Sequence, residues 1–222
     1  MKVIIFDGGP RKGWNTAQMC ESFAAGAAQA GAEVETVRLY DLDFKGCRCC
    51  FACKVEGGAS YGRCAQRDGA SELLGRAAQA DGLVFASPVY FWTVTPQLHA
   101  FIERLLFPFV SYGAGYPTLA PKRAETAMIY TMNVKEPKFY ETYVNDGKGP
   151  LGAFESFIGR VFTKPERVCA FNTYQFSDYA KYDADGWDEA EKKKWRDEEF
   201  PKELAAAREA GRRIAEKIKA KG

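Results

Sequence analysis

Short apolar runs alternate with amphipathic stretches along the chain. The runs end at turn residues, as strands buried on both faces of a sheet do, and they cover Lys2–Phe6, Glu33–Leu39, Gly82–Ala86, Ala124–Met132 and Arg167–Asn172. Apolar residues recur at helical spacing in residues 14–30, 70–80, 95–106 and 152–162, and one or two charged helices follow from Trp187. Strands that alternate with helices predict an α/β fold, a three-layer, doubly wound sheet of five parallel strands with helices on both faces.

The composition indicates one globular domain and excludes several classes of protein. The 222 residues contain no linker, repeat or low-complexity tract, so we expect a single domain over residues 1–222. A net charge of +2 and a pI near 8.1 are too mild to indicate nucleic acid or an anionic membrane as a partner. No apolar stretch approaches about eighteen residues, and the first residues resemble a strand rather than a signal peptide. We therefore expect a cytoplasmic protein.

The first predicted strand runs into a glycine-rich, basic loop. The strand stops at the sequence DGGP, residues 7–10, and a helix follows directly after the loop. Such a loop offers an anion unpaired backbone N–H groups and the positive end of a helix dipole. The sequence therefore predicts a phosphate site, although a basic surface turn would have the same composition. The candidate binding residues of this loop are Gly9, Pro10, Arg11, Lys12, Asn15 and Thr16.

Two common nucleotide-binding loops are excluded here. A nucleoside triphosphate loop needs a Lys-Ser/Thr pair after its last glycine, whereas Gly13 is followed by Trp14-Asn15. The Gly-x-Gly-x-x-Gly fingerprint of dinucleotide sites is also absent. What remains is a loop for one terminal phosphate, as in the flavodoxin-like fold, where FMN lies at the switch point of a sheet with strand order 2-1-3-4-5.

Two further loops lie beside the first one in that strand order. The loop after the third strand carries adjacent aromatic residues that suit a flavin ring; its candidates are Pro88, Val89, Tyr90, Phe91 and Trp92. Aromatic residues that merely anchor the loop to the core are the alternative. The loop after the fourth strand adds Thr131, Met132 and Asn133. We expect both loops to contact the ring and ribityl chain of FMN.

Three ordered motifs resemble the NAD(P)H-dependent FMN reductase family. The sequence GGPRKGWNT at residues 8–16 resembles the family's Gly-Ser-Pro-Arg-Lys-x-Gly-Asn-Thr loop, with Gly9 in place of serine and Trp14 in place of glycine. SPVY at 87–90 and FIER at 101–104 resemble its Pro-x-Tyr loop and the helix that follows. The resemblance extends to about Phe200. It implies a flavodoxin-like fold, bound FMN and electron transfer from a nicotinamide.

This resemblance predicts an FMN-dependent NAD(P)H oxidoreductase. NADH or NADPH would be the electron donor, and the acceptor would be a small molecule such as a quinone, free flavin or an iron centre. The flavin carries the redox chemistry, so no catalytic side chain is expected. A flavodoxin-type electron carrier is one alternative, but the strong acidity expected of a carrier is missing. A redox-sensing protein built on the cysteines is the other.

The cysteine-rich stretch could hold an iron–sulfur cluster. Cys47, Cys50 and Cys53, with Cys64 further on, resemble the iron–sulfur flavoprotein branch, and a [4Fe–4S] cluster takes four cysteines. The same thiols could also bind zinc. Ten residues separate the third cysteine from the fourth, however, and Cys49 is an extra thiol within the run. We therefore expect no metal and interpret these cysteines as residues that pack a loop in a reducing cytosol.

The remaining chemically active residues carry no site prediction. His99 is the only histidine, so a two-histidine metal site is impossible. Cys20 and Cys169 are isolated and expected in the core. The charged stretch from Trp187 to Phe200 is expected to be a solvated helix face with opposite charges on neighbouring turns.

An aromatic loop, Phe107 to Pro121, predicts how the protein assembles. It combines aromatic residues with glycines and prolines, a composition typical of an interface or a lid. We therefore expect a homodimer or homotetramer in which this loop lies at the contact, near the flavin pocket of a neighbouring subunit. The alternative is that the loop folds back onto its own core. Its aromatic residues are Phe107, Phe109, Tyr112 and Tyr116.

Overall fold

The protein folds around one twisted sheet of five parallel strands. The computed structural model describes residues 1–135, 137, 141 and 149–221. The strands are β1 (Lys2–Asp7), β2 (Glu33–Arg38), β3 (Gly82–Pro88), β4 (Glu125–Thr131) and β5 (Glu166–Ala170). They pair in the order β2-β1-β3-β4-β5, and every pair is parallel. This confirms the predicted doubly wound, flavodoxin-like topology.

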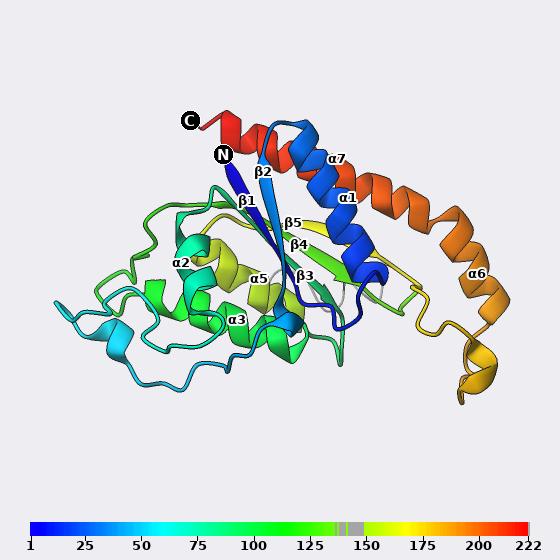
Figure 1. Cartoon of the computed structure of the whole chain (residues 1–222), viewed down its shortest axis with the longest axis horizontal. Helices are drawn as coiled ribbons and strands as arrows, with labels where there is room; N and C mark the ends of the chain where they lie inside the picture. Colours follow the sequence, from blue (N-terminus) through cyan, green and yellow to red (C-terminus); the bar gives the residue numbers. More distant parts are fainter. Residues whose placement is uncertain (136, 138–140, 142–148, 222) are drawn as a thin grey trace.

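Helices cover both faces of the sheet, as Figure 1 shows. Helices α1 (Asn15–Gln29) and α7 (Phe200–Lys219) pack on one face, and α2 (Ser71–Gln79), α3 (Pro96–Leu106) and α5 (Pro150–Val161) pack on the other. Helix α6 (Glu189–Glu198) lies beyond the carboxyl ends of the strands. Short 3-10 turns are η1 (Leu39–Asp41), η2 (Ala52–Lys54), η3 (Phe107–Phe109) and η5 (Tyr179–Lys181). Within the described part of the chain, no helix combines the length and apolar character needed to cross a membrane.

Alternate residues of each strand supply two separate cores. In β1, Ile4 and Phe6 join the cluster beneath α2, α3 and α5, whereas Val3 and Ile5 join the cluster beneath α1 and α7. All four side chains are fully buried. A strand with both faces covered needs a continuous apolar run rather than an alternating pattern, which is what the sequence has at this position.

Two glycines allow α1 and α7 to touch through their backbones. A Cβ atom added at Gly26 would lie 1.7 Å from the carbonyl oxygen of Arg208, and one added at Gly211 would lie 2.1 Å from that of Phe23. No other residue fits at such distances. The crossing fixes α7 on α1, and because α6 immediately precedes α7, it also holds α6 beside the loop that leads into α1.

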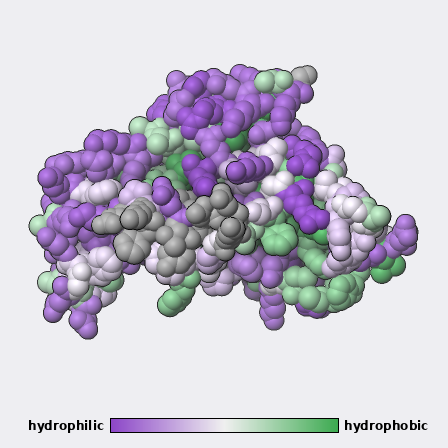
Figure 2. Space-filling view, turned by 180° about the vertical axis from the view of Figure 1, so that it is seen from behind, coloured by the Kyte–Doolittle hydropathy of each residue, from purple (hydrophilic) through white to green (hydrophobic). Residues whose placement is uncertain are grey.

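The predicted interface loop divides between the core and the surface. Phe109 is 6% exposed and packs edge-on against Phe162, with ring centroids 6.1 Å apart. Tyr112 and Tyr116 remain exposed, and Figure 2 shows hydrophobic surface gathered at the end of the molecule that holds this loop. The alternative that the loop folds back onto its own core therefore holds for Phe109, because its side chain completes the core beneath α3.

Candidate functional site

The loop between β1 and α1 is held tightly against β3. Its first two residues are anchored because Gly8 N donates to Ala86 O at 2.8 Å and Gly9 N donates to the buried Asp7 Oδ1 at 2.7 Å. A Cβ at Gly8 would lie 2.9 Å from both the Ala86 carbonyl oxygen and Leu98 Cβ. Glycine is therefore required for the backbone to turn this close to its neighbours.

The amino terminus of α1 is open to an anion. Its N-cap residue, Trp14, makes no side-chain capping bond, so the first N–H groups of the helix receive no cap. Asn15 and Thr16 are each 5% exposed at this end, and Arg11 adds a positive charge. Together with the helix dipole, these groups suit a phosphate. Lys12 instead points outward and pairs with Asp41 at 3.5 Å.

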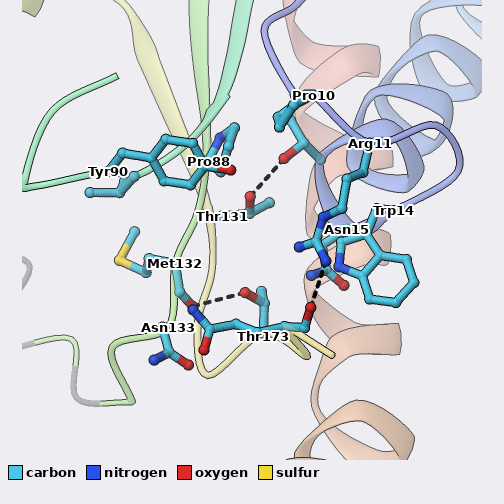
Figure 3. A pocket seen from close by; sticks show the side chains of 14 residues that line it. Pro10, Arg11, Trp14, Asn15, Pro88, Tyr90, Thr131, Met132, Asn133 and Thr173 are labelled. Carbon is cyan, nitrogen blue, oxygen red and sulfur yellow. Dashed lines mark hydrogen bonds between the residues drawn. The ribbon is translucent and has the colours of Figure 1, made fainter. Parts of the chain in front are cut away.

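The three predicted loops meet around one hollow of about 80 Å³ (Figure 3). Arg11, Trp14 and Asn15 lie on one side of the hollow, and Pro88 and Tyr90 lie on the other. The Thr16 and Thr131 hydroxyls join the first and third loops with a 2.7 Å hydrogen bond. The full lining is Gly9, Pro10, Arg11, Trp14, Asn15, Thr16, Pro88, Val89, Tyr90, Thr131, Met132, Asn133, Thr173 and Gln175.

Most of the predicted site residues line this hollow, but three of them do not. Lys12 is directed toward solvent, and the adjacent Phe91 and Trp92 form the tip of a tight turn with φ angles of 48° and 62°. The Phe91 side chain is fully exposed. The prediction that these two aromatic rings contact a cofactor was based on the loop's composition. The turn between Tyr90 and Thr93 leaves Phe91 exposed, whereas Trp92 is partly buried outside the hollow.

A fourth wall of the hollow comes from a segment that carries no motif. Thr173 and Gln175, after β5, line it together with Trp14. The Trp14 Nε1–H group donates to Tyr174 O at 3.0 Å, and Arg11 donates to Gln175 O. These contacts join residues about 160 positions apart, so only the folded chain reveals them.

Helix α6 packs against the site rather than standing in solvent. Arg196 donates to Asn15 Oδ1 at 2.9 Å and to Gln18 Oε1 at 2.8 Å. Lys192 is 2% exposed, and its burial lowers the pKa of the ammonium group to about 8. The prediction of a solvated helix face over residues 187–200 is therefore wrong for the inner side of α6, because the α1–α7 crossing presses that side onto the phosphate loop.

The Asn15 side chain already has hydrogen-bond partners within the chain, so it is less available to a phosphate than the sequence predicts. Its Nδ2 group donates to Tyr174 O at 2.8 Å while its Oδ1 accepts from Arg196. Both ends of the amide therefore have partners within the chain. In this conformation, the helix N–H groups, Arg11 and the hydroxyl of Thr16 are the donors available to a phosphate.

A second hollow gathers the four cysteines of the predicted run. Cys47, Cys50, Cys53 and Cys64 line a space of about 20 Å³ between the cysteine-rich loop and the end of α3. Cys49 lies outside this hollow and is exposed. Within the described residues, no group of three or more Cys, His, Asp or Glu side chains is arranged to hold a metal ion.

A buried arginine holds the cysteine-rich loop in place around the second hollow. Arg104 of α3 is 1% exposed and donates to Asp68 Oδ2 at 2.6 Å, to Lys45 O at 3.0 Å and to Cys64 Sγ at 3.4 Å. Burial alone would raise the pKa of Asp68, but the hydrogen bond from Arg104 lowers it below its usual value. One guanidinium thus ties both ends of the cysteine-rich loop to α3 and brings a positive charge to a thiol.

The two hollows lie at opposite ends of α3. The loop that follows β3 and carries Tyr90 leads into its first residue, and Thr95 caps it by accepting from Leu98 N. Leu106 ends the helix, and Phe107 borders the cysteine hollow. An α-helix of 11 residues is about 16 Å long at 1.5 Å per residue, so most of the length of α3 lies between the two hollows.

Comparison with known proteins identifies a matching family and several relatives of similar sequence. The sequence model of the family described as NADPH-dependent FMN reductase matches residues 1–127. An iron–sulfur flavoprotein of Archaeoglobus fulgidus is 32% identical over 145 residues, which is 65% of this chain and 61% of the relative. One from Methanocaldococcus jannaschii is 36% identical over 104 residues, covering 47% and 51%. The chain thus spans about half to three-fifths of the length of these relatives.

Solved structures share the fold at low sequence identity. A NAD(P)H:quinone oxidoreductase from Methanothermobacter marburgensis superposes with a TM-score of 0.67 at 16% identity, covering 96% of both chains. An FMN-dependent NADH-azoreductase from Bacillus anthracis, solved in complex with FMN, gives 0.64 at 14% identity and covers 97% and 100%. At these identities the likeness concerns the arrangement of sheet and helices.

Proposed function

This chain belongs to the NADPH-dependent FMN reductase family, and from that premise we propose that it is an FMN-dependent NAD(P)H oxidoreductase. The observation that carries the proposal is the convergence of three loops on one hollow beside the uncapped, arginine-flanked start of α1. When bound, FMN would supply the redox chemistry that links a nicotinamide donor to the acceptor. The residues of this chain bind, orient and shield it.

Each wall of the hollow has a distinct part in this proposal. The helix N–H groups, Arg11 and Thr16 hold the phosphate. Thr131 and Thr173 offer short polar groups to the ribityl chain, and Pro88 and Tyr90 offer flat apolar surface to the ring. Asn133, Met132 and Val89 complete the wall between these two groups of residues.

In this proposal the electron acceptor is small: a quinone, a free flavin or an iron centre. The likeness to quinone and azo reductases supports a two-electron acceptor. We also propose that the protein is cytoplasmic, and its seven cysteines, all free thiols, suit that location. A flavodoxin-type carrier is the rival. Adding NADPH to the FMN-loaded protein without oxygen separates the two, because a carrier that is not an enzyme would leave the flavin oxidised.

A second candidate function is electron storage in an iron–sulfur cluster at the cysteine hollow. The observation that favours it is that Cys47, Cys50, Cys53 and Cys64 line one space while the extra thiol, Cys49, is excluded from it. The names of the two curated relatives add support. This proposal departs from our sequence-based expectation that the cysteines only pack a loop, an expectation that has not been tested.

The number of thiols around the hollow suits a cluster that takes four cysteines. One zinc ion would need four ligand atoms at about 2.3 Å from a common centre, and no described group is arranged in that way. In a [4Fe–4S] cluster each cysteine binds a different iron, so the four sulfur atoms stand further apart. The four thiols that line the hollow match this number, and the Arg104 guanidinium beside Cys64 would offset negative charge.

We also propose that the protein is a homodimer or homotetramer. An apolar groove of about 430 Å³ runs between α3, α5 and the loop at 107–112, and two of its aromatic side chains are largely exposed, Tyr112 at 62% and Phe157 at 60%. A continuous apolar groove of this size at the surface is typical of an interface. A second copy of the chain would cover it.

Replacing both Tyr112 and Phe157 with aspartate is expected to give folded monomers. Both side chains are exposed, so the charges would not disturb the core, but two buried carboxylates on each subunit would oppose association. Light scattering at micromolar concentration measures the mass, with Tyr182→Asp, an exposed aromatic residue outside the groove, as the control. A monomeric wild type, or an unchanged mass in the double variant, would contradict the placement of the interface.

A further inference from the structure

Helix α6 carries a lysine that is buried without a carboxylate partner. Lys192 is 2% exposed, and its ammonium group donates to Asn133 Oδ1, to Asn172 Oδ1 at 2.9 Å and to Thr173 O at 3.4 Å. Its charge also lies 4.8 Å from the centre of the Trp187 ring. All three hydrogen-bond acceptors are neutral.

The surrounding carboxylates do not neutralise this charge. Among the described residues Lys192 forms no ion pair, and the adjacent Glu191 pairs with Lys135 instead. Removing an ammonium group from water is costly unless an opposite charge or a full set of hydrogen bonds compensates for it. The depressed pKa of Lys192 expresses this cost, although a value of about 8 still leaves the group mostly charged at neutral pH.

Two of the acceptors belong to the wall of the flavin hollow. Asn133 and Thr173 both line it, and Figure 3 shows them on the same side of the space, next to Met132. The lysine therefore lies directly behind the wall. An ammonium group only donates, so it selects the oxygen of the Asn133 amide and leaves the Nδ2–H groups free to donate elsewhere.

We propose that Lys192 is a positioning residue for the flavin: it fixes the Asn133 amide and places a positive charge behind the pocket wall, so that the pocket binds reduced FMN more tightly than oxidised FMN. This inference rests on the proposed function. A hydride delivers two electrons and one proton, so the ring gains one net negative charge unless it takes another proton from water. A fixed cation favours that charged state.

The expected size of the effect follows from how charges shift equilibria. An opposite charge within about 4–6 Å changes an ionisation equilibrium by roughly one to three powers of ten. Asn133 and Thr173 lie between Lys192 and the hollow, so the low end of this range applies here. We expect removal of the Lys192 charge to reduce the preference for reduced over oxidised FMN at least tenfold. For a two-electron couple, a tenfold change lowers the midpoint potential by about 30 mV.

The test compares four FMN-loaded proteins, the wild type, Lys192→Met, Lys192→Arg and Lys193→Met. Lys193 is exposed and pairs with Asp197 at 2.7 Å, so Lys193→Met removes a charge from the same helix away from the wall. The midpoint potential is measured by equilibration with reference dyes, and the affinity for oxidised FMN by fluorescence titration. Lys192→Met is expected to lower the potential by about 30 mV or more, whereas Lys192→Arg and Lys193→Met stay close to wild type.

A second variant covers the case in which Lys192→Met fails to fold or to bind FMN. Asn133→Asp keeps Lys192 but gives it a carboxylate partner, so the net charge behind the wall falls to zero and the potential should fall in the same direction. An unchanged potential in either loaded variant, or an equal loss of affinity for oxidised and reduced FMN, would overturn the inference and assign Lys192 a purely structural role. A wild type that binds no FMN would instead overturn the proposed function, and this inference with it.

Discussion

Replacing Arg11 with alanine is expected to weaken FMN binding by about 1.5–3 kcal/mol, the usual contribution of a charge-assisted hydrogen bond. The guanidinium flanks the open start of α1, where the phosphate would sit. Riboflavin lacks the phosphate, so its binding should stay nearly the same. Fluorescence titration of the apoprotein with each ligand measures both affinities. Lys12→Ala is the matched control, because Lys12 is a neighbouring cation that points away from the hollow.

The comparison of the two ligands distinguishes binding from support of the fold. Arg11 also donates to Gln175 O and stacks over the Trp14 ring at 4.4 Å, so the substitution loosens the fourth wall as well. If the main role of Arg11 were to hold this wall in place, the substitution would weaken the binding of FMN and of riboflavin equally. That result would remove Arg11 from the phosphate site and leave the helix N–H groups and the Thr16 hydroxyl as its assigned donors.

Protein purified without air is expected to contain about four iron atoms and four acid-labile sulfides per chain, and Cys64→Ser to lose most of both. Cys64 lines the cysteine hollow and accepts from Arg104, so its loss removes one ligand of a four-ligand set. Cys49→Ser is the control, since this thiol is in the same loop but outside the hollow. Iron and sulfide analysis, together with the visible spectrum, gives the result.

Loss of the cluster should leave the flavin site intact. The two hollows are at opposite ends of α3 and have no lining residue in common. Cys64→Ser should therefore still bind FMN with the affinity of the wild type. A wild-type chain that contains no iron after reconstitution with iron and sulfide would contradict the cluster and return these cysteines to the role of packing residues.

The sheet and most of the hollow could be predicted from the sequence because their signals are local. A strand buried on both faces needs an unbroken apolar run, and a loop that crosses close to β3 needs glycine at Gly8; both features are visible in a short window. Once the strand order is known, the loops after β1, β3 and β4 must meet at the same edge. That is why the candidates from three separate stretches line one space.

What the sequence could not reveal depends on long-range packing. Thr173, Gln175 and Lys192 belong to segments without a motif. Thr173 and Gln175 reach the hollow because they follow β5, which pairs with β4, and Lys192 lies behind the wall because α7 is locked onto α1 through Gly26. A charged helix has the same composition whether one side is buried or all sides are solvated. The aromatic residues were also misplaced by the sequence-based predictions. Phe91 is exposed and Phe109 is buried, and composition alone cannot distinguish the two.

Reduction of bound flavin by a nicotinamide tests the central claim most directly. The apoprotein is loaded with FMN, freed of excess cofactor, and mixed with NADPH or NADH in the absence of oxygen while the flavin absorbance is recorded. We predict one FMN per chain and complete bleaching by at least one of the two donors, with the colour restored by a quinone. A protein that retains no FMN, or whose bound FMN stays oxidised with both donors, would contradict the assignment as an NAD(P)H-dependent oxidoreductase.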